Sequence, residues 1–151
     1  MKIRFCLAWL KTDALARGFK SKPSYELFQE YAQRISHFAK VEAGRLRIPE
    51  SSNGRPQALW ICSTGASATT LSSEALAKKL GGLRDTGIQD LWIVVGGASG
   101  IPAAELTRLK PNFLWSFGPG TLPHELACVV AAEQIYRAWT ILNHLPYHLG
   151  H

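Results

Sequence analysis

The chain has 151 residues, of which 46% are hydrophobic and 19% are charged, and its formal net charge is +6. This balance excludes a disordered chain, and the length predicts a single domain, residues 1–151, with a core of its own. The positive charge is typical of a protein with a polyanionic partner such as nucleic acid, although a basic surface without a partner would give the same balance.

The first residues predict a strand rather than an export signal. Residues 2–10 are apolar and rich in β-formers, but they fall short of the roughly 20 residues of a membrane span and lack the cleavage site of a signal peptide. We therefore expect a cytoplasmic protein with no membrane partner. Residues 12–23 hold Arg17, Lys20 and Lys22, and this composition is typical of a mobile basic loop.

A helix and two strands follow. Ser24 is a suitable N-cap, and apolar residues recur at helical spacing beyond it, so we expect an amphipathic helix over residues 24–39. Imperfect alternation predicts a weak strand over 41–48, and the Ser, Asn, Gly and Pro residues of 49–56 predict a turn or loop. The short apolar run of 58–63 predicts another strand.

The second half of the chain alternates helices with strands. The predicted elements are a helix over 72–83, a strand over 91–95, a helix over 102–109, a strand over 113–117 and a helix over 122–143. Glycines at 81–82 or at 87 should end the first of these helices, and Thr121 should be the N-cap of the last. This alternation predicts an α/β fold with a mainly parallel sheet and helices on both faces.

The three cysteines give no sign of a metal or a disulfide framework. Cys6, Cys62 and Cys128 are widely spaced and form no Cys-x-x-Cys pair. We therefore expect no metal, and we expect all three cysteines to be small core residues.

Three of the predicted strands end in loops rich in small residues, over 63–67, 96–100 and 118–121. Glycine lets a ligand approach bare backbone, and the carboxyl ends of parallel strands border the crevice in which ligands bind. Such loops would suit a nucleoside, although turn or helix-stopping glycines are the more frequent explanation of each loop alone. Neither a Gly-x-Gly-x-x-Gly motif nor a Gly-Lys-Ser/Thr phosphate loop is present.

The last helix and the tail hold further candidates. Apolar residues occupy more than one face of 122–143, which suggests a partner subunit. Glu133 and Arg137 are four residues apart, a spacing that allows them to pair on the surface. Tyr147 and His148 follow in what could be a disordered tail, but histidine titrates near neutral pH, so His148 is also a candidate proton acceptor.

Four segments resemble one known family. They are Gly96-Gly97-Ala-Ser-Gly100-Ile, Leu122-Pro123-His124, Glu133-Gln134-Ile-Tyr136-Arg137-Ala138-Trp139 and Asn143-His-x-Pro-Tyr147-His148. In this order they resemble the RlmH-like methyltransferases of the SPOUT superfamily, most specifically over 58–148. Those enzymes use S-adenosyl-L-methionine to methylate N3 of a pseudouridine in large-subunit (23S) ribosomal RNA.

The resemblance implies a homodimer and a trefoil knot near the carboxyl end, with the cofactor bound in the knot. Carried over by motif, the implied cofactor-binding residues are Ile61, Cys62, Gly97, Gly118, Pro119, Gly120, Thr121, Leu122 and Pro123. The apolar side chains of Ile61, Ile101 and Leu122 would enclose the adenine ring, and main-chain groups would bind much of the remainder.

Given this reaction, we also predict catalytic and RNA-binding residues. His148 would remove the proton from N3 as a general base while Tyr147 positions its ring, and both would come from the same chain or from the partner subunit. His124 is a second candidate base, although its place in the Leu-Pro-His turn favours a role in holding the knot. The candidate RNA-binding residues are Arg17, Lys20, Lys22 and Arg137.

Cys128 and Leu149 depart from the family pattern, which has arginine at the first position and a basic residue at the second. These departures leave two alternatives open: a knotted protein that binds cofactor or RNA without catalysis, and a methyltransferase of a different RNA. The link between Ile48 and Leu59 is also short, since relatives have a helix there and a parallel crossover needs about a dozen residues. The placement of the second strand therefore stays open.

Overall fold

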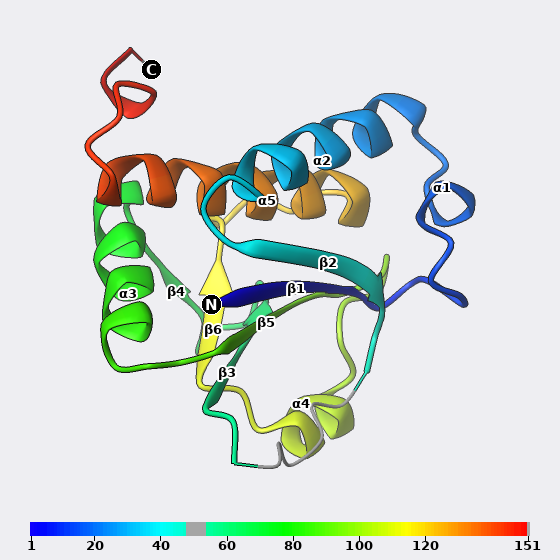
Figure 1. Cartoon of the computed structure of the whole chain (residues 1–151). Coiled ribbons are helices and arrows are strands. Elements are labelled where there is room, and N and C mark those ends of the chain that lie inside the picture. Colours follow the sequence, from blue (N-terminus) through cyan, green and yellow to red (C-terminus); the bar gives the residue numbers. More distant parts are fainter. Residues whose placement is uncertain (48–53, 151) are drawn as a thin grey trace.

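The computed structural model describes residues 1–47 and 54–150, and a parallel sheet forms its centre (Figure 1). The strands are β1 (Lys2–Leu7), β2 (Lys40–Arg45), β3 (Gln57–Cys62), β4 (Thr69–Thr70), β5 (Asp90–Val95) and β6 (Phe113–Ser116). Their order across the sheet is β2-β1-β5-β3-β6-β4, and every neighbouring pair runs parallel. This confirms the predicted α/β fold with a mainly parallel sheet.

The helices cover the two faces of the sheet unequally (Figure 1). They are α1 (Leu15–Gly18), α2 (Lys22–Ile35), α3 (Ser73–Asp85), α4 (Ala103–Leu109), α5 (His124–Leu142) and the short 3₁₀ helix η1 (His148–Gly150). On one face α5 packs against both α2 and α3, and on the other face α4 covers a smaller apolar cluster. The wide apolar surface of α5 is thus used inside the chain, so this surface alone does not require a partner subunit.

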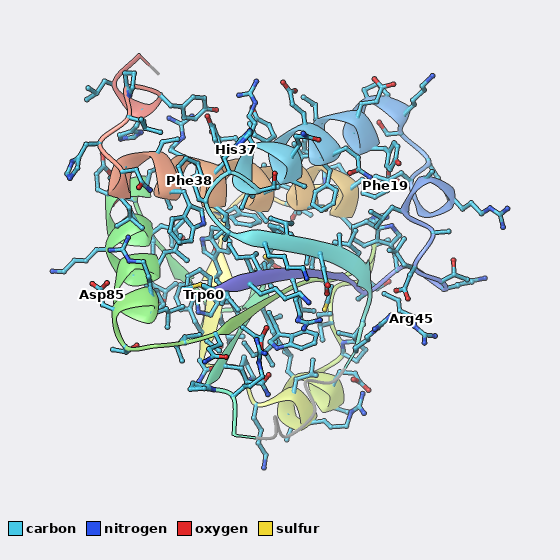
Figure 2. All side chains as sticks on the ribbon, viewed as in Figure 1. Phe19, His37, Phe38, Arg45, Trp60 and Asp85 are labelled. Carbon is cyan, nitrogen blue, oxygen red and sulfur yellow. The ribbon has the colours of Figure 1, made fainter. Side chains whose placement is uncertain are left out.

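Both faces of the central strands are buried, which explains why these strands are continuous apolar runs. In β1, Phe5 belongs to the larger apolar cluster and Cys6 to the smaller one. Trp60 of β3 lies within the larger cluster (Figure 2), only 1% exposed, with its ring edge-on to Phe113 and Trp115. These aromatic contacts hold β3 and β6 together below the loops that follow them.

The prediction of a mobile basic loop over 12–23 was wrong. Residues 15–18 form α1, and α2 begins at Lys22 with Ser21 as its N-cap, whose hydroxyl accepts a 3.3 Å hydrogen bond from the Ser24 N–H. Pro23, in the first turn, suits this earlier start. Helix α2 also ends earlier than expected, at Ile35.

Glycines account for a further difference in α3. The helix passes through Gly81 and Gly82 and reaches Asp85, so the glycine pair does not end it, whereas Gly87 follows its C-cap with a φ of +83°. Gly81 is needed for packing, because a Cβ there would lie 2.9 Å from Leu142 Cδ2 of α5. Close contact between two helices therefore overrides the usual preference of glycine for helix ends.

Three other expectations need correction. Helix α5 has Pro123 rather than Thr121 as its N-cap, so Thr121 remains in the preceding loop. Strand β4 was not predicted, since two residues are too few to show a pattern. The placement of the second strand, left open by the sequence, is now clear: β2 is an edge strand beside β1 rather than a neighbour of β3. The predicted loop over 49–56 lies largely outside the described residues.

Candidate active site

A cavity of about 500 Å³ lies where the carboxyl ends of β3, β5 and β6 meet the first turns of α5. Its walls come mainly from residues 61–65, 95–101 and 117–122, together with His124 and Ala127 of α5. The three glycine-containing loops predicted from the sequence therefore contribute to one cavity. Its size is that of a small-molecule or cofactor site.

Most of the residues predicted to bind a cofactor line this cavity. Those in the lining are Ile61, Cys62, Gly97, Gly118, Gly120, Thr121 and Leu122, and Ile101 joins them. Pro119 and Pro123 belong to the same segment of chain but are not among the lining residues. The structure thus brings the set together, and the cofactor role of each residue remains a prediction.

The backbone of these loops requires glycine at particular points. Gly118 has a φ of +114°, and the Ser116 hydroxyl contacts both its N–H at 3.1 Å and its carbonyl at 3.3 Å. In the second loop, the Gly100 N–H donates to the Gly97 carbonyl at 2.9 Å, and a Cβ on Gly96 would lie 2.9 Å from the Gly100 carbonyl carbon. Side chains larger than hydrogen would therefore change the shape of the cavity.

The lining is suited to an uncharged ring and to polar groups that bind backbone. Apolar side chains come from Ile61, Ile101 and Leu122, and among the described residues the lining contains no carboxylate, lysine or arginine. Cys62 is half-buried here rather than in the core, and burial raises the pKa of its thiol, so the thiol is neutral at pH 7. Cys6 and Cys128 are buried, as predicted for core cysteines.

His124 is the one imidazole of the described residues that lines the cavity. Its ring stands edge-on to that of Trp9 at 4.6 Å between centroids, and its Nε2 lies 3.9 Å from Glu125 Oε2. Trp9 follows the carboxyl end of β1, and its indole N–H donates to the Gly18 carbonyl at 2.8 Å. Trp9 and Glu125 were not singled out from the sequence, since only these long-range contacts give them importance.

Tyr147 and His148 make defined contacts in the structure, so the alternative of a disordered tail was wrong for these two residues. The Tyr147 hydroxyl donates to Glu133 Oε1 at 3.0 Å, and burial raises the pKa of this phenol, which therefore stays neutral at pH 7. His148 Nδ1 lies 3.1 Å from Arg137 Nη1, and its Nε2 lies 2.7 Å from Glu74 Oε1.

These contacts define the form of the His148 ring. Arginine can only donate, so Nδ1 accepts from Arg137 and Nε2 carries the hydrogen that is donated to Glu74. The same contact with His148 is the main cause that lowers the pKa of the Glu74 carboxyl. Both ring nitrogens of His148 are therefore occupied by contacts within its own chain.

The tail and the cavity lie apart along α5. Ala127 is the last residue of the helix in the cavity lining, and the tail contacts the helix at Glu133 and Arg137. A helix rises about 1.5 Å per residue, so these contacts lie roughly 9 and 15 Å farther along the axis. The structure does not bring His148 and Tyr147 into the cavity of their own chain.

The candidate RNA-binding residues fall into two groups. Arg17 and Lys20 are exposed, and Lys22 is exposed with its Nζ 3.9 Å from Glu26. Arg137 differs, because it is paired with Glu133 at 2.6 Å and its side chain is only 13% exposed. The predicted Glu133–Arg137 pair thus exists, but it is partly buried rather than on the surface.

The described residues contain neither a candidate metal cluster nor a candidate membrane helix. Among residues 1–47 and 54–150, no group of three or more His, Cys, Asp or Glu side chains is placed to hold a metal ion. No helix in these same ranges is long and apolar enough to cross a membrane.

Comparison with known proteins gives a consistent result. A family model described as a predicted SPOUT methyltransferase matches residues 15–148. Similar proteins named ribosomal RNA large subunit methyltransferase H occur in Bartonella tribocorum (39% identity, 88% of this chain and 79% of the relative) and Methylobacterium nodulans (38%, 93% and 83%). A protein of the same name from Ruegeria pomeroyi is 44% identical, over 92% of this chain and 99% of the relative.

Proposed function

The chain belongs to the SPOUT methyltransferase family, and we propose that it transfers a methyl group from S-adenosyl-L-methionine to N3 of a pseudouridine in large-subunit (23S) ribosomal RNA. The observation that carries this proposal is the cavity at the ends of β3, β5 and β6. Its apolar walls and glycine-rich backbone fit an adenine nucleoside with a small polar tail.

The residues present fit this cofactor by their chemistry. Ile61, Ile101 and Leu122 provide apolar surface for the adenine ring, while the backbone of 96–100 and 118–121 offers N–H and carbonyl groups. Bound there, S-adenosyl-L-methionine would supply an electrophilic methyl carbon. The loops would hold that carbon in line with the acceptor nitrogen, and such alignment supplies much of the rate in a displacement reaction.

The acceptor nitrogen carries a proton that must leave. We propose that His148 of a partner subunit accepts it and that Tyr147 positions the imidazole ring, which makes the active protein a homodimer. Support comes from the position of the tail, which lies along α5 away from the cavity of its own chain. To act as a base, His148 would have to release its Nδ1 contact with Arg137. His124, which lines the cavity, is the alternative candidate for the general base.

The proposal extends to partner and place. Exposed Arg17, Lys20 and Lys22 are the basic residues proposed to contact RNA phosphates, and Arg137, whose charge Glu133 compensates, is the weakest of the four candidates. We place the reaction in the cytoplasm and treat 1–151 as one domain, in which one sheet contains all the described strands. The trefoil knot near the carboxyl end stays a prediction from the resemblance.

Two measurements test the proposed reaction. Calorimetry with S-adenosyl-L-methionine should show binding at one site per chain, and its absence would contradict the assigned cavity. Ribosomes and free 23S rRNA from a strain that lacks the native enzyme should gain one methyl group at a pseudouridine, mapped to the nucleotide. Cofactor binding without methylation would instead support a protein that has lost catalysis, and methylation elsewhere would support a different RNA target.

A mixing experiment tests the proposed origin of the base. His148→Ala should bind cofactor but lose activity, and Gly118→Val should lose cofactor binding because β-branched residues rarely adopt its φ of +114°. In a mixed dimer of the two inactive proteins, the His148→Ala chain keeps an intact cavity and the Gly118→Val chain keeps an intact His148. If the base comes from the partner subunit, these two parts meet in one active site, so activity should return. Full activity of His148→Ala alone would refute its role, and the matched His124→Ala variant would then be the next test.

A further inference from the structure

The segment 11–21, here called the basic arm, connects the region after β1 to α2 and is tied down at two points. Two carboxylates make these ties: Asp13, near the start of the arm, and Glu125, in the first turn of α5. Neither tie is visible in sequence patterns, since Glu125 and the arm residues that it contacts are 104 and 105 positions apart.

Asp13 joins the arm to the edge strand. Its Oδ1 accepts the backbone N–H of Arg45 at 3.0 Å, and its other oxygen pairs with the Arg47 guanidinium. The carboxylate sits directly on the backbone of β2, because a Cβ on Gly44 would lie 2.5 Å from Asp13 Oδ1. The Arg45 N–H is the main cause that lowers the pKa of the Asp13 carboxyl, so the group is ionised at neutral pH.

Glu125 joins the other end of the arm to the cavity. Glu125 is 8% exposed, and its carboxylate accepts the backbone N–H groups of Lys20 at 3.2 Å and Ser21 at 3.0 Å. The preceding residue, His124, lines the cavity and contacts Trp9, whose indole N–H holds the Gly18 carbonyl. One turn of α5 therefore contacts the cavity with one residue and the arm with the next.

Four cations near these ties form no ion pair with a carboxylate of the described residues. Lys11, Arg17, Lys20 and Arg45 are exposed, and no carboxylate of the described residues forms an ion pair with any of them. Arg45 lies at the end of β2, on the same side of the molecule as the arm (Figure 2). Because all strands run parallel, this side is also the carboxyl edge at which the cavity opens.

We propose that Lys11, Arg17, Lys20 and Arg45 form one phosphate-binding surface for the RNA substrate, which Glu125 holds at a fixed position relative to the cavity. The choice of RNA as the partner rests on the proposed function, while the surface itself rests on charge and position. Each cation bound to a phosphate releases counterions, so binding through such a surface weakens as salt rises. Glu125 acts as a positioning residue, since it contacts the arm backbone rather than the substrate.

The surface is tested by two triple variants of equal charge. Arg17→Gln, Lys20→Gln and Arg45→Gln remove three cations from the proposed surface, whereas Lys40→Gln, Lys78→Gln and Lys110→Gln remove three exposed cations elsewhere. Binding of a fluorescein-labelled 20-nucleotide poly(U) is measured by anisotropy over a range of KCl concentrations. The plot of log affinity against log salt should lose about 2 from its slope in the first variant, at ~0.7 per single-stranded phosphate contact, and little in the second. Equal slopes in the two variants would overturn the proposal.

The positioning role is tested by Glu125→Ala and Glu125→Gln. The alanine variant removes both hydrogen bonds to the charged carboxylate and should raise the KM for rRNA at least about tenfold, while kcat and the affinity for S-adenosyl-L-methionine stay unchanged. The glutamine variant keeps one acceptor oxygen, so its KM for rRNA should lie between those of the wild type and the alanine variant. If the alanine variant does not fold, the KM of the glutamine variant is the test. An unchanged KM, or an equal loss of RNA and cofactor affinity, would overturn this role. Because the poly(U) measurement needs no methyl transfer, failure of the surface and failure of the proposed reaction are distinguishable.

Discussion

Gly118 offers a direct test of how the cavity is shaped, because its neighbour Gly120 provides a matched control in the same loop. Gly118 has a φ of +114°, a conformation that L-residues rarely adopt, and the Ser116 hydroxyl holds both of its backbone polar groups. Gly120 also lines the cavity, but its φ is not in the positive region and an added Cβ would meet nothing within 4 Å. Alanine at 118 should therefore be strained, and alanine at 120 should not.

The size of the effect follows from this geometry. A non-glycine residue held in a sparsely populated backbone region costs about 1–3 kcal/mol. If the loop keeps its shape, this strain lowers the free energy of unfolding, and the melting temperature falls by about 2–4 °C for each kcal/mol. If the loop relaxes in the free protein, ligand binding must restore the strained shape. The strain then reduces the binding free energy, and the affinity for S-adenosyl-L-methionine falls by about 5- to 150-fold.

Calorimetry of unfolding gives the melting temperature, and titration calorimetry with S-adenosyl-L-methionine gives the affinity, so both effects can be measured on the same samples. Gly118→Ala should show a lower melting temperature, a weaker affinity, or a combination that sums to the expected cost. Gly120→Ala should leave the melting temperature of the free protein unchanged within about 2 °C, since ΔΔG stays within about 0.5 kcal/mol. Identical behaviour of the two alanine variants would refute the claim that the backbone at Gly118 shapes the cavity.

Three further predictions concern other parts of the molecule. Gly82→Ala should raise the free energy of unfolding in urea by about 0.5–1 kcal/mol, because the added methyl meets open space within a helix, whereas Gly81→Ala, with its methyl 2.9 Å from Leu142, should give no such gain. Lys110→Gly should stabilise by about 0.5–1 kcal/mol, since Lys110 caps α4 with a φ of 51°; a loss in the same urea experiment would contradict this. The Cys62 thiol should react with iodoacetamide at a rate that still rises above about pH 10, because burial raises its pKa above the ordinary range of a thiol and only the thiolate reacts. Mass spectrometry of the alkylated protein measures this rate, and a plateau below about pH 10 would exclude the raised pKa.

The strands could be predicted from the sequence because local signals and tertiary structure agree there. Strands β3 and β5 each begin one residue before the predicted start, and β6 begins where expected, since buried parallel strands appear as continuous apolar runs. The four-residue helix α1 could not be predicted, because it depends on contacts from outside its own sequence, such as the indole hydrogen bond of Trp9 to Gly18. The role of Gly81 within α3 likewise depends on a residue of another helix, Leu142, whereas Gly87 after the helix was one of the two positions that the sequence offered for its end.

Part of the candidate site could likewise be predicted from local sequence, and part could not. The glycine loops were predictable, since parallel strands bring their carboxyl ends to one edge, and a small residue after such a strand is visible locally. The surroundings of His148 were not, because Glu74 is 74 positions away and only the folded chain brings the two together. The same holds for Glu125, whose sequence position in an ordinary helical turn gives no sign of its contacts with Lys20 and Ser21.

The two ties of the basic arm also limit how its length can vary in evolution. Surface connections usually tolerate insertions and deletions, since nothing holds their ends in register. Here Asp13 and Lys20 are both attached, one to β2 and the other to α5, so the chain between them must span a fixed distance. An insertion could bulge outward and keep both attachments, whereas a deletion would have to break one of them. Natural variants should therefore lengthen this segment more readily than they shorten it.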